Sequence, residues 1–430
     1  MYRWKSRLLL AVGVALLSAC GSGNSSNSSM TATSDPLSFY QHSAVFVNNT
    51  TLYAWGANES GQIGNGTTSN SSVPVLVTRF ANYSAGNGVA IGSNHTLAFQ
   101  KYSTVRAWGF NRYGQLGNGL TADNQTPNSS VPVTVRKWGS RASLSGVTAV
   151  AAGGYFSLAL DRNGTVWSWG KNDHGQLGRL SNQNTFGNYS SQMADKVVVA
   201  AVSSPLTGVT AIAAGGAHAL ALKNDGTVWG WGYNEWGQVG DGSPHDKPNH
   251  FFPVLVPFND TPPRTVTIAK IAAGSSHSLA LDSDGFIWAW GYNYFGQLGN
   301  GLHGENVYSE TPVKISIPAP GLTSAALIAA GASHSLAYDP VTDILYAWGY
   351  NVFGQLGDGT TINRYTPVAI SGFTLKVLNG TLPASISASW DHSHARKTDG
   401  SWWSWGENSV GQLGIGNQTN QFSPVRVRGM

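Results

Sequence analysis

The chain has 430 residues, of which 25 are basic and 21 acidic, giving a formal net charge of +4. Arg3, Lys5 and Arg7 account for most of this excess, because the remaining residues carry a net charge of only about +1. Without a long basic run the chain lacks the cationic patch that nucleic-acid binding needs, so we expect no nucleic-acid partner. A single cysteine, Cys20, excludes a framework of disulfides.

Residues 1–19 are predicted to be a lipoprotein signal peptide. Three basic residues precede the apolar run LLLAVGVALL, which is too short to span a bilayer but suits a signal peptide. The run ends in Leu-Ser-Ala-Cys, which resembles a bacterial lipobox. The resemblance implies cleavage before Cys20 and lipidation of its thiol; the alternative is an ordinary free or buried thiol.

Residues 20–35 are predicted to be the lipidated cysteine and a flexible tether, because GSGNSSNSSMTATSD is rich in Gly, Ser and Asn. We therefore expect a protein of the cell envelope, held at the membrane only by its lipid, or an extracellular one. By resemblance to Gram-negative lipoproteins, Gly21 after the cysteine implies the outer membrane if the source is Gram-negative.

Residues 36–430 repeat one unit. The pattern Trp-Gly-x-Asn-x-x-Gly-Gln-(Leu/Ile/Val)-Gly occurs seven times, at intervals of 53 to 62 residues. The copies begin at Trp55, Trp108, Trp169, Trp231, Trp290, Trp348 and Trp405. Such a period is the signature of a repeat architecture.

Two further landmarks flank the tryptophan motif. A histidine lies 13 or 14 residues upstream in six copies: His42, His95, His218, His277, His334 and His392. The third copy has Phe156 at this position. A Pro-Val pair follows the motif in every copy except the third, which has KVVVAAV at 196–202 instead.

Each unit is predicted to be an antiparallel meander of about four strands. In AHALAL (217–222) the residues alternate between two faces, and turns such as Asp225-Gly226 favour tight hairpins with both central residues at positive φ. The Pro-Val segment suits an edge strand. The small residue before each Trp-Gly indicates that another backbone lies against that face.

Seven such sheets bury their apolar faces by packing around an axis, so we expect an all-β, seven-bladed propeller forming one domain over 36–430. The chain begins mid-unit, and its last segment, SPVRVRGM, is expected to complete the first blade and close the ring.

These motifs, WGxNxxGQLG with GxxHSLAL and DGxVWxWG, closely resemble the repeat of the regulator of chromosome condensation family over nearly all of 36–430. The resemblance implies a seven-bladed propeller. The founding member of that family is a guanine nucleotide exchange factor for the GTPase Ran and binds chromatin, other members are interaction modules, and similar secreted bacterial propellers inhibit β-lactamases. Function is therefore implied less specifically than fold.

The sequence offers no strong catalytic or metal site. We expect the repeated histidines to be buried and bonded to neighbouring backbone groups. His392 with His394, and His245 with His250, are weak metal candidates because no cysteine or carboxylate stands at ligand spacing. No P-loop, nucleophile elbow or HExxH occurs. Paired acids could still assemble across blades, but we expect neither an enzyme nor a cofactor.

Aromatic residues vary at two positions of the repeat, directly after Trp-Gly and directly before Gly-Gln. Copies two, four, five and six are aromatic at both: Phe110, Tyr113, Tyr233, Trp236, Tyr292, Phe295, Tyr350 and Phe353. They could form a binding rim for a protein, peptide or sugar. The alternative, which the sequence favours, is that they pack between adjacent blades.

Long inserts at 120–146, 179–208 and 243–266 are a second candidate for binding. We therefore expect a monomeric, non-catalytic, lipid-anchored propeller that recognises a protein or polysaccharide partner. The alternatives are a regulator of another enzyme, either an exchange factor or an inhibitor, and a hydrolase or lyase.

Overall fold

The computed structural model describes residues 41–47, 51–78, 88–100, 104–120, 127–180, 190–199, 204–244, 249–263, 265–317, 326–380 and 383–430. These residues all belong to one compact unit, Phe39–Met430. The predicted signal peptide and tether, with Cys20, lie outside them. The described part of the chain is built of strands and contains no helix, and so none that could cross a membrane.

The strands form seven antiparallel sheets in which spatial order follows chain order. The first three sheets are β1 (His42–Val47), β2 (Thr51–Gly56), β3 (Ser71–Leu76); β4 (Gly88–Ile91), β5 (His95–Phe99), β6 (Arg106–Gly109), β7 (Ser129–Thr134); and β8 (Val147–Ala152), β9 (Phe156–Asp161), β10 (Val166–Lys171), β11 (Ser190–Lys196). The fourth and fifth are β14 (Val209–Ala214), β15 (His218–Lys223), β16 (Val228–Tyr233), β17 (Asn249–Val256); and β18 (Ile268–Ala273), β19 (His277–Asp282), β20 (Ile287–Tyr292), β21 (Tyr308–Ile315). The last two are β22 (Leu327–Ala330), β23 (His334–Asp339), β24 (Ile344–Gly349), β25 (Arg364–Ala369); and β26 (Ser385–Ser389), β27 (His392–Arg396), β28 (Trp402–Gly406), β29 (Gln421–Arg426). A short ribbon, β12 (Val198–Val199) with β13 (Ser204–Pro205), links the third and fourth sheets.

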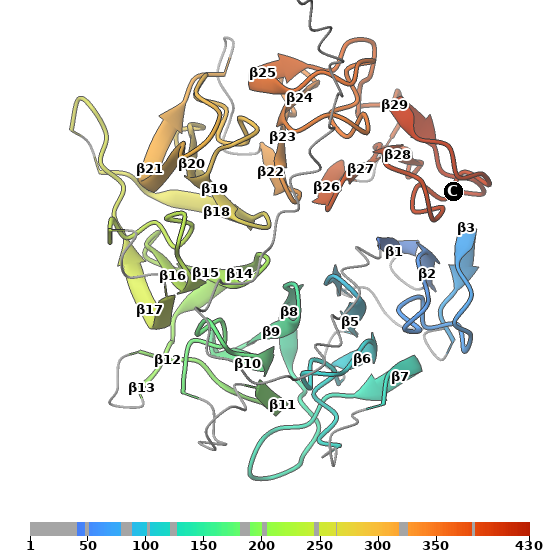
Figure 1. The fold of residues 1–430 in the computed structure, drawn as a ribbon, viewed down its shortest axis with the longest axis vertical. Helices are drawn as coiled ribbons and strands as arrows, with labels where there is room; N and C mark the ends of the chain where they lie inside the picture. The colour runs from blue at the N-terminus through green and yellow to red at the C-terminus, as the bar shows by residue number, and fades with distance from the viewer. Residues whose placement is uncertain are drawn as a thin grey trace, which may run out of the picture. The chain divides into compact units, whose positions relative to one another are not determined.

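Within this unit the sheets follow one another around a common centre (Figure 1). Contacts join β1 to β4, β4 to β8, β8 to β14, β14 to β18, β18 to β22 and β22 to β26. The seventh sheet meets the first, because Trp55 of β2 donates from Nε1 to the carbonyl of Gln412 (2.8 Å) and Gly416 N donates to the carbonyl of Ser72 (2.8 Å). The predicted seven-bladed propeller is therefore confirmed.

One detail of the predicted closure is wrong. β29 pairs with β28, from Trp403 opposite Arg426 to Gly406 opposite Gln421, and is the outer strand of the seventh sheet rather than part of the first. The first sheet has three strands in the described residues. The connection from β28 to β29 is the motif loop of the seventh copy, so the two strands pair within their own meander as β24 and β25 do. The loop after Trp405, in the same C-terminal sheet, closes the ring against β3.

The core lies between neighbouring sheets, and the alternation along the strands decides which interface each residue enters. In β15, Ala219 and Ala221 join the cluster shared with the third sheet, whereas Leu220 and Leu222 join the cluster shared with the fifth. Trp231 enters the first of these clusters and is fully buried. Each sheet therefore contributes an Ala- and Trp-bearing face to one neighbour and a larger aliphatic face to the other.

Two local predictions need correction. The turn at Asp225-Gly226 was predicted to have both central residues at positive φ. Only Gly226 has positive φ (80°), so the turn is not of the type I′ class. In the third copy the outer strand is Ser190–Lys196, upstream of most of the KVVVAAV segment. The Pro-Val segments do form outer edge strands, as in β17 and β21.

Candidate binding face

The repeated motif folds into one corner in every sheet. In the fifth sheet, Asn293 Oδ1 accepts a hydrogen bond from Leu298 N (2.9 Å), and Gln297 Oε1 accepts one from Phe295 N (3.0 Å). The loop then presents the carbonyl of Gln297 to the next sheet, where Trp348 Nε1 donates to it (2.9 Å). The Asn, Gln and Trp of the motif thus hold the loop and join it to its neighbour.

All seven interfaces repeat this bond between tryptophan and glutamine carbonyl. The pairs are Trp55–Gln412, Trp108–Gln62, Trp169–Gln115, Trp231–Gln176, Trp290–Gln238, Trp348–Gln297 and Trp405–Gln355. All seven tryptophans are fully buried. Their recurrence along the chain is therefore explained by packing.

The repeated histidines also join neighbouring sheets, but their partner differs from the prediction. His277 Nε2 lies 3.0 Å from Ser335 Oγ of the next sheet, and Ser335 Oγ donates to the carbonyl of Gln297 (2.9 Å). Because the hydroxyl hydrogen is used in that bond, the histidine carries its proton on Nε2 and donates to the hydroxyl. The partner is a side-chain hydroxyl rather than a backbone group.

The same arrangement recurs at six interfaces: His42–Thr96, His95–Ser157, His218–Ser278, His277–Ser335, His334–Ser393 and His392–Ser43. Burial lowers the pKa of His95, His218, His277 and His334 to about 3, with the charge of His277 a smaller cause for His218 and His334. These imidazoles are neutral and structural at ordinary pH.

The metal candidates find no support in the described residues. No group of three or more His, Cys, Asp or Glu there could hold a metal ion. His392 and His394 both point Nε2 at Ser43 Oγ (3.0 and 2.8 Å), and His250 lies 3.3 Å from Asp241. His245 lies outside the described residues.

The propeller has two distinct faces. We define the motif face as the seven loops that follow Trp-Gly together with the turns that join the first and second strands of each sheet. The hairpin face, at the opposite ends of the strands, carries the turns between second and third strands and the connections to the next sheet. Each long insert contains an outer strand, β7, β11 or β17, so its two ends lie on different faces.

All eight aromatic rim candidates lie on the motif face and are half-buried. They meet across the seams between sheets: Trp236 packs on Tyr292 with ring centroids 4.8 Å apart, and Phe295 packs on Tyr350 at 4.5 Å. Phe353 lies 6.1 Å from Tyr350. At both the Trp236–Tyr292 and the Phe295–Tyr350 contacts, the residue before Gly-Gln in one sheet meets the residue after Trp-Gly in the next.

The remaining candidates follow a related arrangement. Tyr233 packs on His174 (4.7 Å), while Phe110 and Tyr113 both contact Tyr155 (5.9 and 5.4 Å). The aromatic rings therefore pack between blades and, at the same time, leave part of their surface exposed on one face. Their use in binding stays a prediction.

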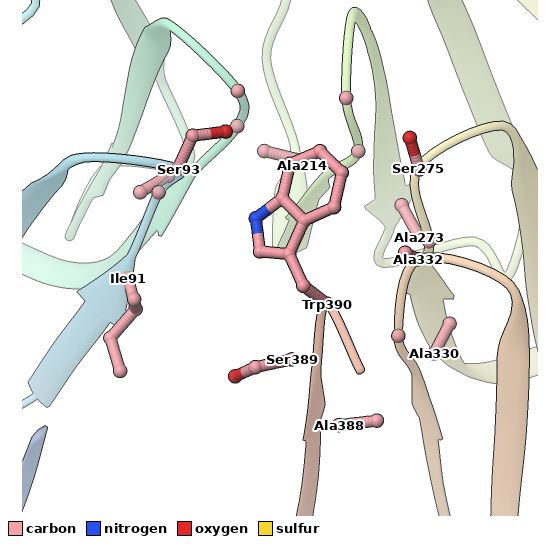
Figure 2. Close-up of a pocket in the computed structure, with 18 of the residues that line it drawn as sticks. Ile91, Ser93, Ala214, Ala273, Ser275, Ala330, Ala332, Ala388, Ser389 and Trp390 are labelled. Carbon is pink, nitrogen blue, oxygen red and sulfur yellow. The ribbon is translucent and has the colours of Figure 1, made fainter. Parts of the chain in front are cut away.

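A cavity of about 110 Å³ lies at the centre of the motif face, where the first strands end. Five sheets place small residues here, such as Gly154, Gly216 and Ser275, whereas the seventh sheet contributes Trp390. Figure 2 shows the Trp390 indole standing among these strand ends. Sequence reasoning missed Trp390, although its departure from the small residues at equivalent positions was a usable signal.

Backbone hydrogen bonds between sheets hold the wall of this cavity. Gly154 N donates to Gly216 O, Gly216 N to Ser275 O, and Ala332 N to Trp390 O, each at 3.0 Å. Gly215 beside them must lack a side chain, since a Cβ would lie 2.2 Å from His218 Cε1 and 2.4 Å from the next sheet's backbone. The Gly of the GxxH motif is thus explained by close approach.

Two carboxylates belong to segments of the seventh sheet that meet on the motif face. Asp391 follows Trp390, and its carbonyl accepts a hydrogen bond from Glu407 N (2.9 Å). Gln355 Nε2 donates to Asp391 Oδ1 (3.1 Å), and Ser409 Oγ donates to Glu407 Oε1 (2.9 Å). Burial, with the Glu407 charge, raises the pKa of Asp391 to about 7, and burial raises the pKa of Glu407.

Comparison with known proteins gives two family matches. A model described as RCC1-like domain matches residues 134–430. A model of the regulator of chromosome condensation (RCC1) repeat matches residues 50–99 and 104–160. Together they cover every strand of the seven sheets except β1.

Similar curated proteins include the ultraviolet-B receptor UVR8 of Arabidopsis thaliana, 29% identical over 79% of this chain and 69% of that protein. The E3 ubiquitin-protein ligase HERC2 of Homo sapiens is 28% identical over 89% of this chain, which spans 7% of the ligase.

Solved structures show the same fold. Human WBSCR16 has a TM-score of 0.72 at 24% identity, covering 88% of this chain and 93% of that one. Prp20p of Saccharomyces cerevisiae has a TM-score of 0.70 at 23% identity, covering 90% and 88%. Prp20p has binding properties toward Gsp1p and histones.

Proposed function

Because the chain belongs to the RCC1-like domain family, we propose that it is a non-catalytic interaction protein that binds a protein partner through its motif face. The observation that carries the proposal is the set of eight half-buried aromatic residues on that face. Rigid rings that keep part of their surface exposed bury apolar area on binding with little loss of side-chain entropy. Prp20p, which has the same fold, binds proteins, and this supports a protein partner.

We further propose that the propeller is tethered to the cell envelope through a lipid on Cys20. The support is sequence alone: a basic start, a short apolar run and Leu-Ser-Ala-Cys in succession. Mass spectrometry of the mature protein tests this, with an acylated N-terminal Cys20 as the expected result. An unmodified Met1 terminus would contradict it and would favour a regulator of an intracellular GTPase.

Protein and glycan arrays test the binding function. The wild-type protein is compared with a Trp236→Ser, Phe353→Ser variant of the motif face. The matched control is Phe286→Ser, Leu378→Ser, since these residues are 40% and 91% exposed and lie on the hairpin face.

We expect a protein ligand whose binding is lost only in the motif-face variant. If the wild-type protein binds glycans on the array instead of a protein, the ligand class is a polysaccharide. Loss of binding only in the control would show that the hairpin face is the binding surface, and the proposal would be wrong.

A further inference from the structure

The motif face carries a net negative charge, whereas the chain as a whole has a formal net charge of +4. Among the described residues its loops and turns hold eight acidic and three basic side chains. The acidic residues are Glu59, Asp173, Glu235, Asp241, Glu305, Asp358, Asp391 and Glu407, and the basic ones are Arg112, Lys171 and Arg179. A face with this excess attracts cationic groups.

Some of these charges are already compensated. Lys171 pairs with Asp173 (2.8 Å), and Asp358 pairs with Arg364 at the start of β25 (2.7 Å). Arg179 is only 3% exposed, so it adds little to the outer surface. The other acidic residues of the face have no ion pair with Lys or Arg in the described part of the chain.

Asp391 and Glu407 are two acidic residues of this face that are joined by a backbone hydrogen bond. Their described partners are neutral, namely Gln355 for Asp391, and Ser409 with Gln41 for Glu407. Neither carboxylate forms an ion pair within the described part of the chain. Two neighbouring, partly desolvated carboxylates without a cation are unfavourable, and an arriving cation would relieve that cost.

Two aromatic residues belong to the segments that hold this pair. Tyr350 belongs to the same loop as Gln355, whose side chain donates to Asp391 Oδ1 (3.1 Å), and the charges of both carboxylates, after burial, help to raise the pKa of its hydroxyl. Trp390, the residue before Asp391, stands in the central cavity (Figure 2). Carboxylates beside aromatic faces are the combination that recognises ammonium and guanidinium groups.

We propose that the motif face binds a basic segment of its protein partner, with a Lys or Arg side chain seated between Asp391 and Glu407 and against the ring of Tyr350. The inference rests on the proposed function and names the chemistry of the partner. The aromatic seams hold the apolar parts of the segment, and the carboxylate pair selects its charge.

The test uses three fluorescent octapeptides that share one aromatic-containing sequence and differ at four positions. These positions are Lys and Arg in the basic peptide, Gln in the neutral peptide and Glu in the acidic peptide. Binding to the full chain is measured by fluorescence anisotropy at low and at physiological salt. The site variants are Asp391→Asn with Glu407→Gln, and Glu407→Gln alone. The matched control is Asp225→Asn with Asp399→Asn, which removes two acidic charges from the hairpin face while keeping the acceptor oxygens for Thr227 and Ser401.

We expect the basic peptide to bind at least tenfold more tightly than the other two, and the double site variant to lose at least tenfold in affinity. The single variant should lose less, and the control should bind like the wild type. Equal affinity for all three peptides, or equal loss in site variant and control, would overturn the inference. If a partner found on the arrays binds the motif face through a neutral or acidic segment, this inference fails while the proposed function stands.

Discussion

His218 Nε2 lies 2.9 Å from Ser278 Oγ across the interface between the fourth and fifth sheets. Between the third and fourth sheets both members of this pair are changed, since Phe156 replaces the histidine and Ala219 the hydroxyl residue. Phe156 and Ala219 lie in one buried apolar cluster. The chain therefore contains a natural replacement of a polar pair by an apolar one.

This replacement predicts the behaviour of variants at the next interface. Ser278→Ala should cost about 1–3 kcal/mol in the free energy of unfolding, because it leaves a buried imidazole N–H unpaired. Combining it with His218→Phe should restore much of that loss by reproducing the Phe156–Ala219 arrangement. Urea unfolding of the three proteins measures both values. A double variant less stable than Ser278→Ala alone would contradict the account.

The buried histidines predict a steep acid unfolding. Burial lowers the pKa of His95, His218, His277 and His334 from 6.5 to about 3, so the folded state binds fewer protons than the unfolded state between these values. Stability is therefore intact above pH 6.5 and falls as the pH drops toward 3, by about 1.4 kcal/mol per pH unit for each histidine. Unfolding free energies measured from pH 7 to pH 4 give the slope, and a slope close to zero would contradict the assigned burial.

Asp391 predicts the opposite dependence. Because burial and the Glu407 charge raise its pKa from 3.8 to about 7, the folded state holds this proton longer than the unfolded state. Its contribution is present at low pH and is lost as the pH rises through 7. Asp391→Asn, which keeps an acceptor for Gln355, should therefore gain stability over the wild type at pH 8, on the order of 1–3 kcal/mol. The gain should nearly vanish at pH 4, and a variant that is less stable than wild type at pH 8 would refute this.

The tryptophan motif and the aromatic seams should differ in structural importance. Trp290 is fully buried and donates to the carbonyl of Gln238 (3.0 Å), so Trp290→Ala should cost about 3–5 kcal/mol. Tyr292 is half-buried against Trp236, so Tyr292→Ala should cost about 1–2 kcal/mol. Thermal unfolding compares the two, and a larger loss for Tyr292→Ala would place the seam in the core and remove it as a binding surface.

Much of the fold could be predicted because the sequence of one structural unit is repeated seven times. The alternation in AHALAL assigns Ala219 and Leu220 to opposite interfaces, and the structure places them there. The partner of His218 could not be predicted in the same way, because Ser278 belongs to the next sheet, 60 residues away. The sheet that the final strand joins was predicted wrongly, although SPVRVRGM follows its own tryptophan motif as the other Pro-Val segments do, and β29 accordingly pairs with β28.

The candidate site was predicted only in part. The aromatic positions stood out because they vary inside a fixed motif, and they do lie on one face. Asp391 and Glu407 did not stand out, since they belong to different loops and meet only through the hydrogen bond from Glu407 N to the Asp391 carbonyl. Pairing of that kind depends on the register of β27 with β28, which sequence patterns leave open.

Two valines at opposite ends of the strands of the sixth sheet test the central claim most directly. Val352, beside Tyr350 and Phe353 on the motif face, is 50% exposed, and Val341, in the turn between β23 and β24 on the hairpin face, is 67% exposed. A photo-reactive amino acid placed at each position in turn is irradiated with the protein partner identified on the arrays. We expect covalent capture from position 352 and none from position 341. Capture from position 341 alone would show that recognition occurs on the hairpin face and would contradict the account.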